Sequence, residues 1–373
     1  MAALIEEILG AQAGTAVEIQ PDHIILTDGP SHRAMEGILR VAAPEKVTVI
    51  YDHDVPAGSS EGAAIFGEIN HFAHRFGCRF VQSVGVGRQW MLNEMIQPGQ
   101  IVVGGGTHNG IYGAIGALGV GLSPARLART LEEGKLQIVV PETVTVELTG
   151  TLACGSALDL GLLLLQKLGR RICGKALQFV GGDRLTRQEK AVLCGVACGT
   201  GAFTALFSDG GAPDLRLPLS EAVPMVQLPC GGWEKQAAAA ICPLSEAAGM
   251  EVQAGQIGGF TGGTIDDLRM AARWMEGQTL ARGFRLSIVP ATSRDYLMAL
   301  SEGLIERFIA FNAQVLAAGE RSVVRQGAGV IDRGERLVTT GLYTFDGCMG
   351  APGGEVYTAS VESVVKAAVT GRL

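Results

Sequence analysis

Two histidines stand at positions where proton-transfer chemistry is feasible. The first follows an apolar run at 46–51, typical of a buried strand, in the sequence Asp52-His53-Asp54. In α/β folds, ligands bind at the carboxyl ends of parallel strands, and a neighbouring carboxylate can orient an imidazole and raise its basicity. A turn with an exposed histidine is the alternative interpretation. Asp52 and His53 are therefore candidate catalytic residues.

The second histidine closes a glycine-rich segment. The strand pattern at 100–103 leads into three glycines at 104–106, which are followed by Thr107 and His108. Consecutive glycines let the backbone approach a ligand closely, and their N–H groups can bind an anion. A tight connection without a ligand explains the glycines equally well. The spacing matches neither a phosphate-binding P-loop nor a dinucleotide fingerprint.

A third glycine-rich junction lies at 257–268, where Thr264 can cap a helix whose N-terminus could hold a carboxylate. The alternative is a glycine-rich loop that only connects a strand to a helix. Other chemistry has little support. No C-x-x-C pair and no G-x-S-x-G nucleophile motif occurs. Cys194 and Cys198 lie four residues apart on an apolar helix face, which is typical of buried structural thiols. His71 and His74 fit a solvated helix face.

Helical and extended patterns alternate along the chain, which predicts an α/β fold. Glycine-rich turns at 149–150 and 248–249 suggest three domains, 1–148, 149–249 and 250–373. We expect strands at 46–51, 78–82, 100–103, 136–148, 175–179 and 285–289, and helices at 59–76, 123–133, 157–168, 186–198 and 265–274.

The composition excludes several classes of protein. Of 373 residues, 47% are hydrophobic and 18% charged, which excludes a largely disordered chain. The net charge is −7 without a basic block, so we expect no nucleic-acid partner. The longest apolar run, 160–165, is too short to span a bilayer. The N-terminus resembles neither a signal nor a transit peptide, so we expect a cytoplasmic protein with reduced thiols.

Taken in order, these segments resemble the aconitase superfamily, in particular the large subunit of isopropylmalate isomerase and homoaconitase. Residues 52–56 resemble the family's Asp-His-Asn-Val-Pro motif, and 98–121 resemble its Cys-Gly-Asp-Ser-His-Thr block together with the residues after that block. Residues 257–268 resemble Ile-Gly-Ser-Cys-Thr-Asn-Gly-Arg-Ile-Glu-Asp-Leu. Shorter matches lie at 28–37, 178–190 and 334–350. The resemblance implies a three-lobed α/β/α fold with the active-site cleft between the lobes.

The departures from the family pattern concern its cofactor. The family holds a [4Fe-4S] cluster through three cysteines, and the matching positions here are Gly104, Phe260 and one of residues 322–325. None of these supplies the thiolate that such clusters need. We therefore expect no [4Fe-4S] cluster and no other cofactor, although a divalent metal ion could occupy the same cleft. The family's substrate-binding arginines fall near Tyr343 and Cys348.

The resemblance and the departures together predict an enzyme. We expect a lyase or isomerase that acts on a small hydroxy- or unsaturated di- or tricarboxylate by histidine-based proton transfer. His53 and His108 would be the acid–base pair, Asp52 would orient His53, and Gln178 would replace the family's glutamate near His108. The expected substrate-binding residues are Ser31, Gly105, Gly106, Thr107, Asn109, Gln178, Thr261, Thr264 and Tyr343.

Two other functions fit the sequence. One is a hydro-lyase that uses another divalent metal ion or none, and the other is a non-catalytic carboxylate-binding or scaffold subunit. The resemblance also implies a swivel domain that completes the active site. We expect no swivel domain in this chain, so either a separate small subunit supplies it or the protein works without it.

Overall fold

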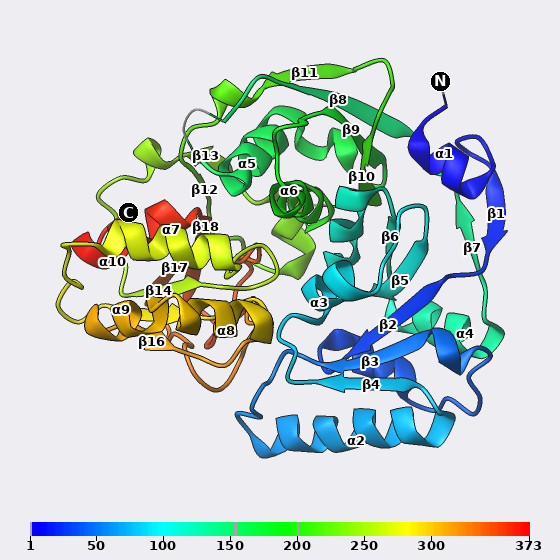
Figure 1. Ribbon diagram of the computed structural model, residues 1–373, viewed down its shortest axis with the longest axis horizontal. Helices are drawn as coiled ribbons and strands as arrows, with labels where there is room; N and C mark the ends of the chain where they lie inside the picture. The colour runs from blue at the N-terminus through cyan, green and yellow to red at the C-terminus, as the bar shows by residue number, and fades with distance from the viewer. Residues whose placement is uncertain (1, 153–154, 200) are drawn as a thin grey trace.

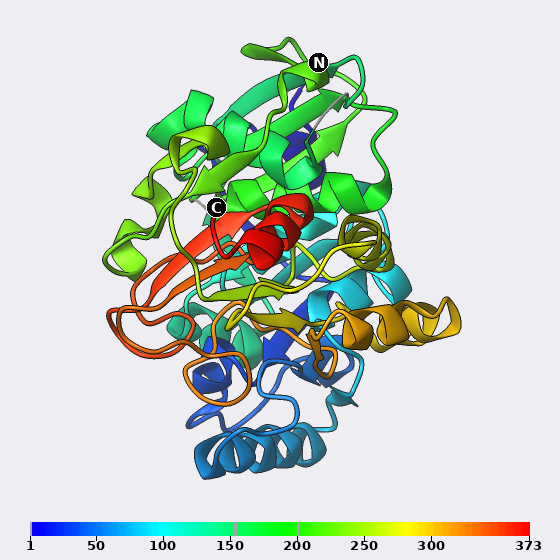
Figure 2. The same cartoon turned by 90° about the vertical axis from the view of Figure 1, so that its left-hand side faces the viewer.

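The computed structural model describes residues 2–152, 155–199 and 201–373. Over these residues the strands form a two-stranded, a five-stranded, a four-stranded and a seven-stranded sheet, with helices between them. In Figures 1 and 2 most of the N-terminal part (blue to cyan) and the middle part (green) lie on opposite sides of the molecule, but the first residues (darkest blue) lie beside the green part. The C-terminal part (yellow to red) lies beside both. The predicted α/β class is confirmed.

The five-stranded sheet positions both candidate histidines. Its strands are parallel in the order β4-β3-β2-β5-β6, so β2 lies between β3 and β5. Parallel strands end at the same edge of a sheet, so the segments that follow β2, β3 and β5 meet there. The strands are β2 (His23–Thr27), β3 (Val47–Tyr51), β4 (Arg79–Gln82), β5 (Ile101–Gly105) and β6 (Leu118–Leu122).

Helices and short 3-10 turns cover this sheet, and a small antiparallel pair lies beside it. Strand β3 is buried along its whole length, as expected when both faces of a parallel sheet are covered. The helices are α1 (Leu4–Leu9), α2 (Ser60–Phe76), α3 (Gly87–Glu94) and α4 (Pro124–Glu133), and the 3-10 turns are η1 (Pro30–Met35), η2 (Pro44–Lys46) and η3 (His108–Ile115). The antiparallel pair consists of β1 (Ala16–Ile19) and β7 (Leu136–Val139).

The four-stranded sheet is parallel in the order β10-β9-β8-β11. Helix α6 packs on η3 so closely that a Cβ on Gly110 would lie 2.2 Å from the Cys198 sulfur. Cys194 and Cys198 are both buried, as predicted. The elements are β8 (Thr143–Thr149), β9 (Ala176–Gly181), β10 (Thr204–Ser208), β11 (Leu215–Pro218), α5 (Ala157–Leu168), α6 (Arg187–Gly199) and η4 (Gly169–Ile172).

The seven-stranded sheet is mixed, in the order β13-β12-β18-β17-β14-β15-β16, with β12 antiparallel to both its neighbours. Its strands are β12 (Met225–Gln227), β13 (Ile241–Pro243), β14 (Ala254–Ile257), β15 (Arg285–Ile288), β16 (Gln314–Val315), β17 (Arg336–Thr339) and β18 (Glu355–Ala359). Its helices are α7 (Ile265–Met275), α8 (Ser293–Ser301), α9 (Leu304–Ala310) and α10 (Val361–Thr370), with turns η5 (Leu219–Glu221), η6 (Trp233–Ala238) and η7 (Leu244–Glu246).

The strand pairing bears on two sequence expectations. The extended pattern at 136–148 is two strands, β7 and β8, that belong to different sheets. Strands β12 and β13 already join the third sheet ahead of residue 250. The division into domains at 148 and 250 stays a prediction. In the described part of the chain, no helix is long and apolar enough to cross a bilayer.

Candidate active site

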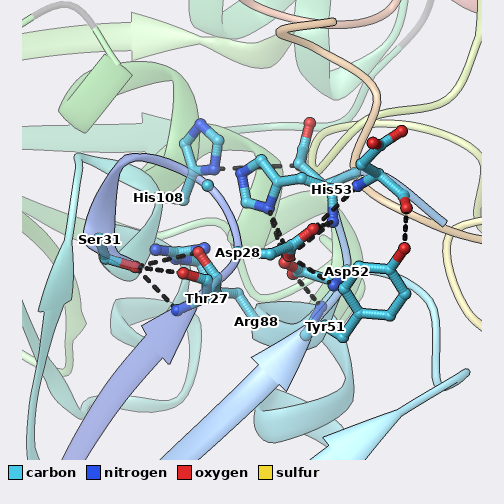
Figure 3. Close-up of polar contacts among 12 residues, drawn as sticks. Thr27, Asp28, Ser31, Tyr51, Asp52, His53, Arg88 and His108 are labelled. Carbon is cyan, nitrogen blue, oxygen red and sulfur yellow. Dashed lines mark hydrogen bonds and ion pairs between the residues drawn. The ribbon is translucent and has the colours of Figure 1, made fainter. Parts of the chain in front are cut away.

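Three loops meet at the carboxyl edge of the five-stranded sheet, and each carries titratable side chains. Asp28 follows β2, Asp52 and His53 follow β3, and His108 follows β5 (Figure 3). Because β2 lies between β3 and β5, the two candidate histidines come from strands on either side of it. The topology therefore brings both histidines to one place, as the sequence predicted.

Asp28 fixes the turn that carries His53. Its carboxylate accepts hydrogen bonds from the backbone N–H groups of Asp52 (2.8 Å), His53 (3.0 Å) and Asp54 (2.9 Å). Asp52 is fully buried, and its two oxygens contact the backbone N–H of Gly87 (2.8 Å) and Nδ1 of His53 (2.6 Å). Two carboxylates thus hold one imidazole.

These carboxylates favour the charged form of His53. Burial alone would lower the pKa of His53, but the negative charges of Asp52 and Asp28 outweigh it and raise this pKa well above its usual value. Burial would likewise raise the pKa of Asp28, yet the hydrogen bond and charge of His53 lower it to about 2. A Cβ on Gly29 would lie 2.5 Å from Nε2 of His53, so only glycine leaves room for this ring.

The ion pair predicts a pH-dependent stability. The pKa of His53 is higher in the folded chain than in the unfolded chain, where it is about 6.5. The contribution of His53 to the free energy of unfolding is therefore complete below about pH 6.5 and is lost as the pH rises through the pKa of the folded chain. We expect His53→Gln to lower the free energy of unfolding most below pH 6.5. The difference from the unsubstituted chain should shrink at higher pH. Urea unfolding of both chains at several pH values measures it, and a constant difference would contradict the assignment.

His108 has the opposite environment. Its ring stacks on the fully buried Phe260, with centroids 3.7 Å apart. Its Nε2 lies 2.5 Å from the hydroxyl of Tyr343, which also contacts the hydroxyl of Thr107 at 3.0 Å. Burial, then the positive charges of Arg88 and His53, lower the pKa of His108 well below its usual value. His108 is therefore neutral near pH 7 while His53 is charged.

Arg88 holds the glycine-rich loop in place. Its side chain is only 3% exposed and donates to the carbonyl oxygen of Gly105 (2.5 Å) and to Oδ1 of Asn109 (3.2 Å). A Cβ on Gly105 would lie 2.4 Å from that of Ser31, so the loop requires glycine there. The Ser31 hydroxyl accepts from the backbone N–H of Thr27 (2.8 Å). Arg88 thus supplies a buried positive charge beside His108.

Some of the predicted site residues lie at His108 and others lie elsewhere. Tyr343 contacts His108, and Thr107 contacts Tyr343. The Asn109 amide donates within the glycine-rich loop, to the Gly106 carbonyl oxygen, and Ser31 packs against Gly105. Thr261 donates to the Thr340 carbonyl oxygen (2.8 Å), and Thr264 caps α7 through Asp267. Both threonines line a cavity of about 680 Å³ whose lining includes neither histidine.

The expected placement of Gln178 beside His108 is wrong. The side-chain oxygen of Gln178 accepts from the backbone N–H of Leu4 (2.8 Å), and its nitrogen donates to the Gly210 carbonyl oxygen (2.7 Å). Gln178 therefore ties the N-terminal helix α1 to the four-stranded sheet. The carboxylate that faces His108 belongs to Glu320, whose Oε2 lies 3.9 Å from Nδ1.

Sequence reasoning missed Arg88, Glu320 and the stacking role of Phe260. Arg88 lies in an ordinary helical segment, and Glu320 lies in a loop between β16 and β17, so neither carries a local motif. For Phe260 a signal existed, because it stands where the family resemblance places a cysteine. The Phe260 ring stacks on the His108 imidazole, with centroids 3.7 Å apart.

The residues present do not fit a cluster held by thiolates. Phe260 packs on His108, and the space beside Gly104 is filled by Asn109 and Ile25. Within the described ranges, the one group of three candidate metal ligands is Asp28, Asp52 and His53, and it contains no cysteine. Its carboxylate oxygens already accept backbone N–H groups or contact the imidazole.

Comparisons with known proteins agree with this geometry. The model of the aconitase family (aconitate hydratase) matches residues 33–210 and 207–371. The chain is 31% identical to 3-isopropylmalate dehydratase large subunit 2 of Archaeoglobus fulgidus, covering 97% of this chain and 94% of that one. It is 29% identical to the homoaconitase large subunit of Thermus thermophilus, covering 97% and 93%.

A solved structure shows the same fold. The crystal structure of Thermococcus kodakaraensis aconitase X in its holo-form matches with a TM-score of 0.58 over 98% of this chain and 92% of that one. The sequence identity is 12%, so this likeness concerns the fold alone. The expected aconitase-like α/β arrangement is confirmed.

Proposed function

Because the chain belongs to the aconitase family, we propose that it is a lyase or isomerase of small hydroxy- or unsaturated di- or tricarboxylates. One arrangement carries the proposal: a single site holds two imidazoles in opposite environments, where Asp52 and Asp28 raise the pKa of His53 and burial beside Arg88 lowers the pKa of His108. Titratable groups whose environments push their pKa values apart are the usual sign of an acid–base pair.

The two histidines would divide the chemistry. Loss of water from a hydroxy acid requires that a proton leaves the carbon beside a carboxylate and that the departing hydroxide is protonated. Neutral His108, with Tyr343 on its Nε2, can take up or deliver a proton at the mouth of the glycine loop. The positive charge of His53, held by Asp52 and Asp28, can stabilise the negative charge that develops on the substrate carboxylate.

We further propose that this chemistry proceeds without a [4Fe-4S] cluster. A Lewis-acidic metal ion supplies several kcal/mol of charge stabilisation in reactions of this kind. The positive charges of buried Arg88 and of partly buried His53 could supply part of it here. Migration of a double bond needs no departing hydroxide, so it would suit a metal-free site better than dehydration.

The test measures the exchange of substrate hydrogen atoms for deuterium from the solvent. The chain is incubated in D₂O with a panel of hydroxy- and unsaturated di- and tricarboxylates, and products are followed by proton NMR. The proposal expects deuterium at the carbon beside a carboxylate in at least one acid. Incorporation of ¹⁸O from water separates dehydration from double-bond migration. Binding in a thermal-shift assay without any exchange would contradict catalysis and favour a carboxylate-binding subunit.

A second chain is part of the proposal. The relatives from Archaeoglobus fulgidus and Thermus thermophilus are named large subunits, and the match covers 94% and 93% of their lengths. We expect a separate small subunit to bind this chain and to raise its rate of exchange. Co-expression with a candidate small subunit, followed by size-exclusion chromatography and the deuterium assay, measures both effects. Full exchange by the isolated chain, unchanged by the added subunit, would contradict this expectation.

A further inference from the structure

Glu320 is a buried carboxyl group that the chemistry described so far does not use. Its backbone N–H donates to the Asp52 carbonyl oxygen (2.7 Å), which fixes it beside the turn that carries His53. The residue is 1% exposed. Its Oε1 accepts from the backbone N–H of Ser322 (2.8 Å), whereas its Oε2 has no hydrogen-bond partner and lies 3.9 Å from Nδ1 of His108.

A buried carboxylate oxygen without a partner is costly, and a proton on that oxygen removes most of the cost. Some of the groups around Glu320 raise its pKa and others lower it. Burial raises the pKa of this carboxyl group, the charge of His53 and the contact with Ser322 lower it, and Asp52 raises it. The net effect raises the pKa of Glu320 above its usual value, and the unpartnered Oε2 is the oxygen that a proton would occupy.

His108 connects Glu320 to the glycine-rich loop. Its Nδ1 faces Glu320, its Nε2 contacts the Tyr343 hydroxyl, and that hydroxyl contacts Thr107 in the glycine-rich loop. Arg88 and His53 are the positive charges that act on His108, and Phe260 covers one ring face. An imidazole between two hydrogen-bonding groups can pass a proton by exchanging its tautomers, without itself becoming charged.

We propose that Glu320 is a positioning residue that sets the tautomer of His108 and stores the proton that His108 delivers. In the resting state Oε2 of Glu320 carries the proton, Nδ1 of His108 is bare and Nε2–H points at Tyr343. When the substrate takes the Tyr343 hydroxyl proton, Tyr343 takes the proton of Nε2 and Nδ1 takes that of Glu320. One proton reaches the substrate, His108 stays neutral and Glu320 becomes a carboxylate.

The gap of 3.9 Å between Oε2 and Nδ1 is longer than a hydrogen bond. One bridging water molecule, or a small rotation of the carboxyl group, would close it. Hydrogen bonds in unliganded active sites are commonly long and tighten when a substrate binds. This inference rests on the proposed function for its role, but its geometry can be tested without any substrate.

The test is the tautomer of His108 in the full chain, read by ¹⁵N NMR of labelled histidines. The chain has only six histidines, and a His108→Gln variant assigns the signal. As the pH rises through the pKa of Glu320, we expect His108 to change from the Nε2–H to the Nδ1–H tautomer. In Glu320→Gln, the amide oxygen should keep the backbone N–H of Ser322, which leaves the amide nitrogen to donate to Nδ1, so His108 should keep Nε2–H throughout. The surface variant Glu362→Gln should behave like the unsubstituted chain.

One unchanging tautomer in the unsubstituted chain, or an identical titration in Glu320→Gln, would overturn the proposal. If Glu320→Gln does not fold, the titration of the unsubstituted chain alone decides. The same experiments distinguish a failure of the proposed function from a failure of the role proposed for Glu320. A tautomer change without turnover of any acid contradicts the enzyme and leaves Glu320 assigned, whereas turnover with a fixed tautomer contradicts only Glu320. If turnover depends on the proton of Glu320, kcat of the unsubstituted chain should fall as the pH rises through the pKa of Glu320. In Glu320→Gln this fall should be absent from the pH profile of kcat.

Discussion

Replacing His108 by alanine is expected to lower kcat by about 10²–10⁴-fold, the usual contribution of a general acid or base. The reason is geometric as well as electrostatic. His108 is the neutral imidazole of the site, and its Nε2 contacts the hydroxyl that would exchange a proton with the substrate. The measurement is the initial rate on the acid that shows deuterium exchange, at saturating concentration.

Two further variants test whether the loss of rate comes from the contact between His108 and Tyr343. His74→Ala removes an exposed histidine on helix α2 and should leave kcat unchanged. Tyr343→Phe keeps the ring that stacks beside His108 but removes its hydroxyl partner, so it should lower kcat while the fold is preserved. If His108→Ala retained the kcat of the unsubstituted chain, the site would not be the active site that we propose.

Replacing Asp28 by alanine is expected to lower the free energy of unfolding by about 3–5 kcal/mol at neutral pH. The substitution leaves three backbone N–H groups in the β3 turn without an acceptor, and each unsatisfied buried group costs roughly 1–3 kcal/mol. It also removes one of the two carboxylates that hold the charged His53. Urea unfolding monitored by circular dichroism measures the change.

A neighbouring aspartate supplies the matched control. Asp22 precedes β2, and its carboxylate accepts a single backbone N–H, that of Ile101 (2.8 Å). Asp22→Ala should therefore cost only about 1 kcal/mol, a typical value for one hydrogen bond. Equal losses for Asp22→Ala and Asp28→Ala would show that Asp28 does not organise the turn beside His53.

Much of the fold can be predicted from local signals. Ser59 and Gly77 mark the ends of helix α2, since the Ser59 side chain accepts from the Gly62 N–H and Gly77 is left-handed. Ser123 and Pro124 mark the start of α4 in the same way. The assignment of β7 and β8 to different sheets could not be predicted, because sheet partners lie far away in the sequence.

The residues of the candidate site also differ in whether a local sequence signal identifies them. Asp52, His53 and His108 could be identified because each follows a strand pattern or matches a family motif. Arg88 and Glu320 reach the site from other elements through contacts with no local sequence signal. The misplacement of Gln178 has the same physical origin. A family match identifies the position in the chain, but the amide is fixed by the backbone of Leu4 and Gly210, which the motif does not include.

The central claim is that imidazoles and buried positive charges perform the chemistry without an iron–sulfur cluster. The most direct measurement is the iron and acid-labile sulfide content of chain purified without oxygen, together with its visible absorption spectrum and its rate of solvent exchange. We predict colourless protein, free of iron and sulfide, that still exchanges deuterium into its substrate. Brown protein with stoichiometric iron and sulfide, whose exchange is lost when the iron is removed, would contradict the claim.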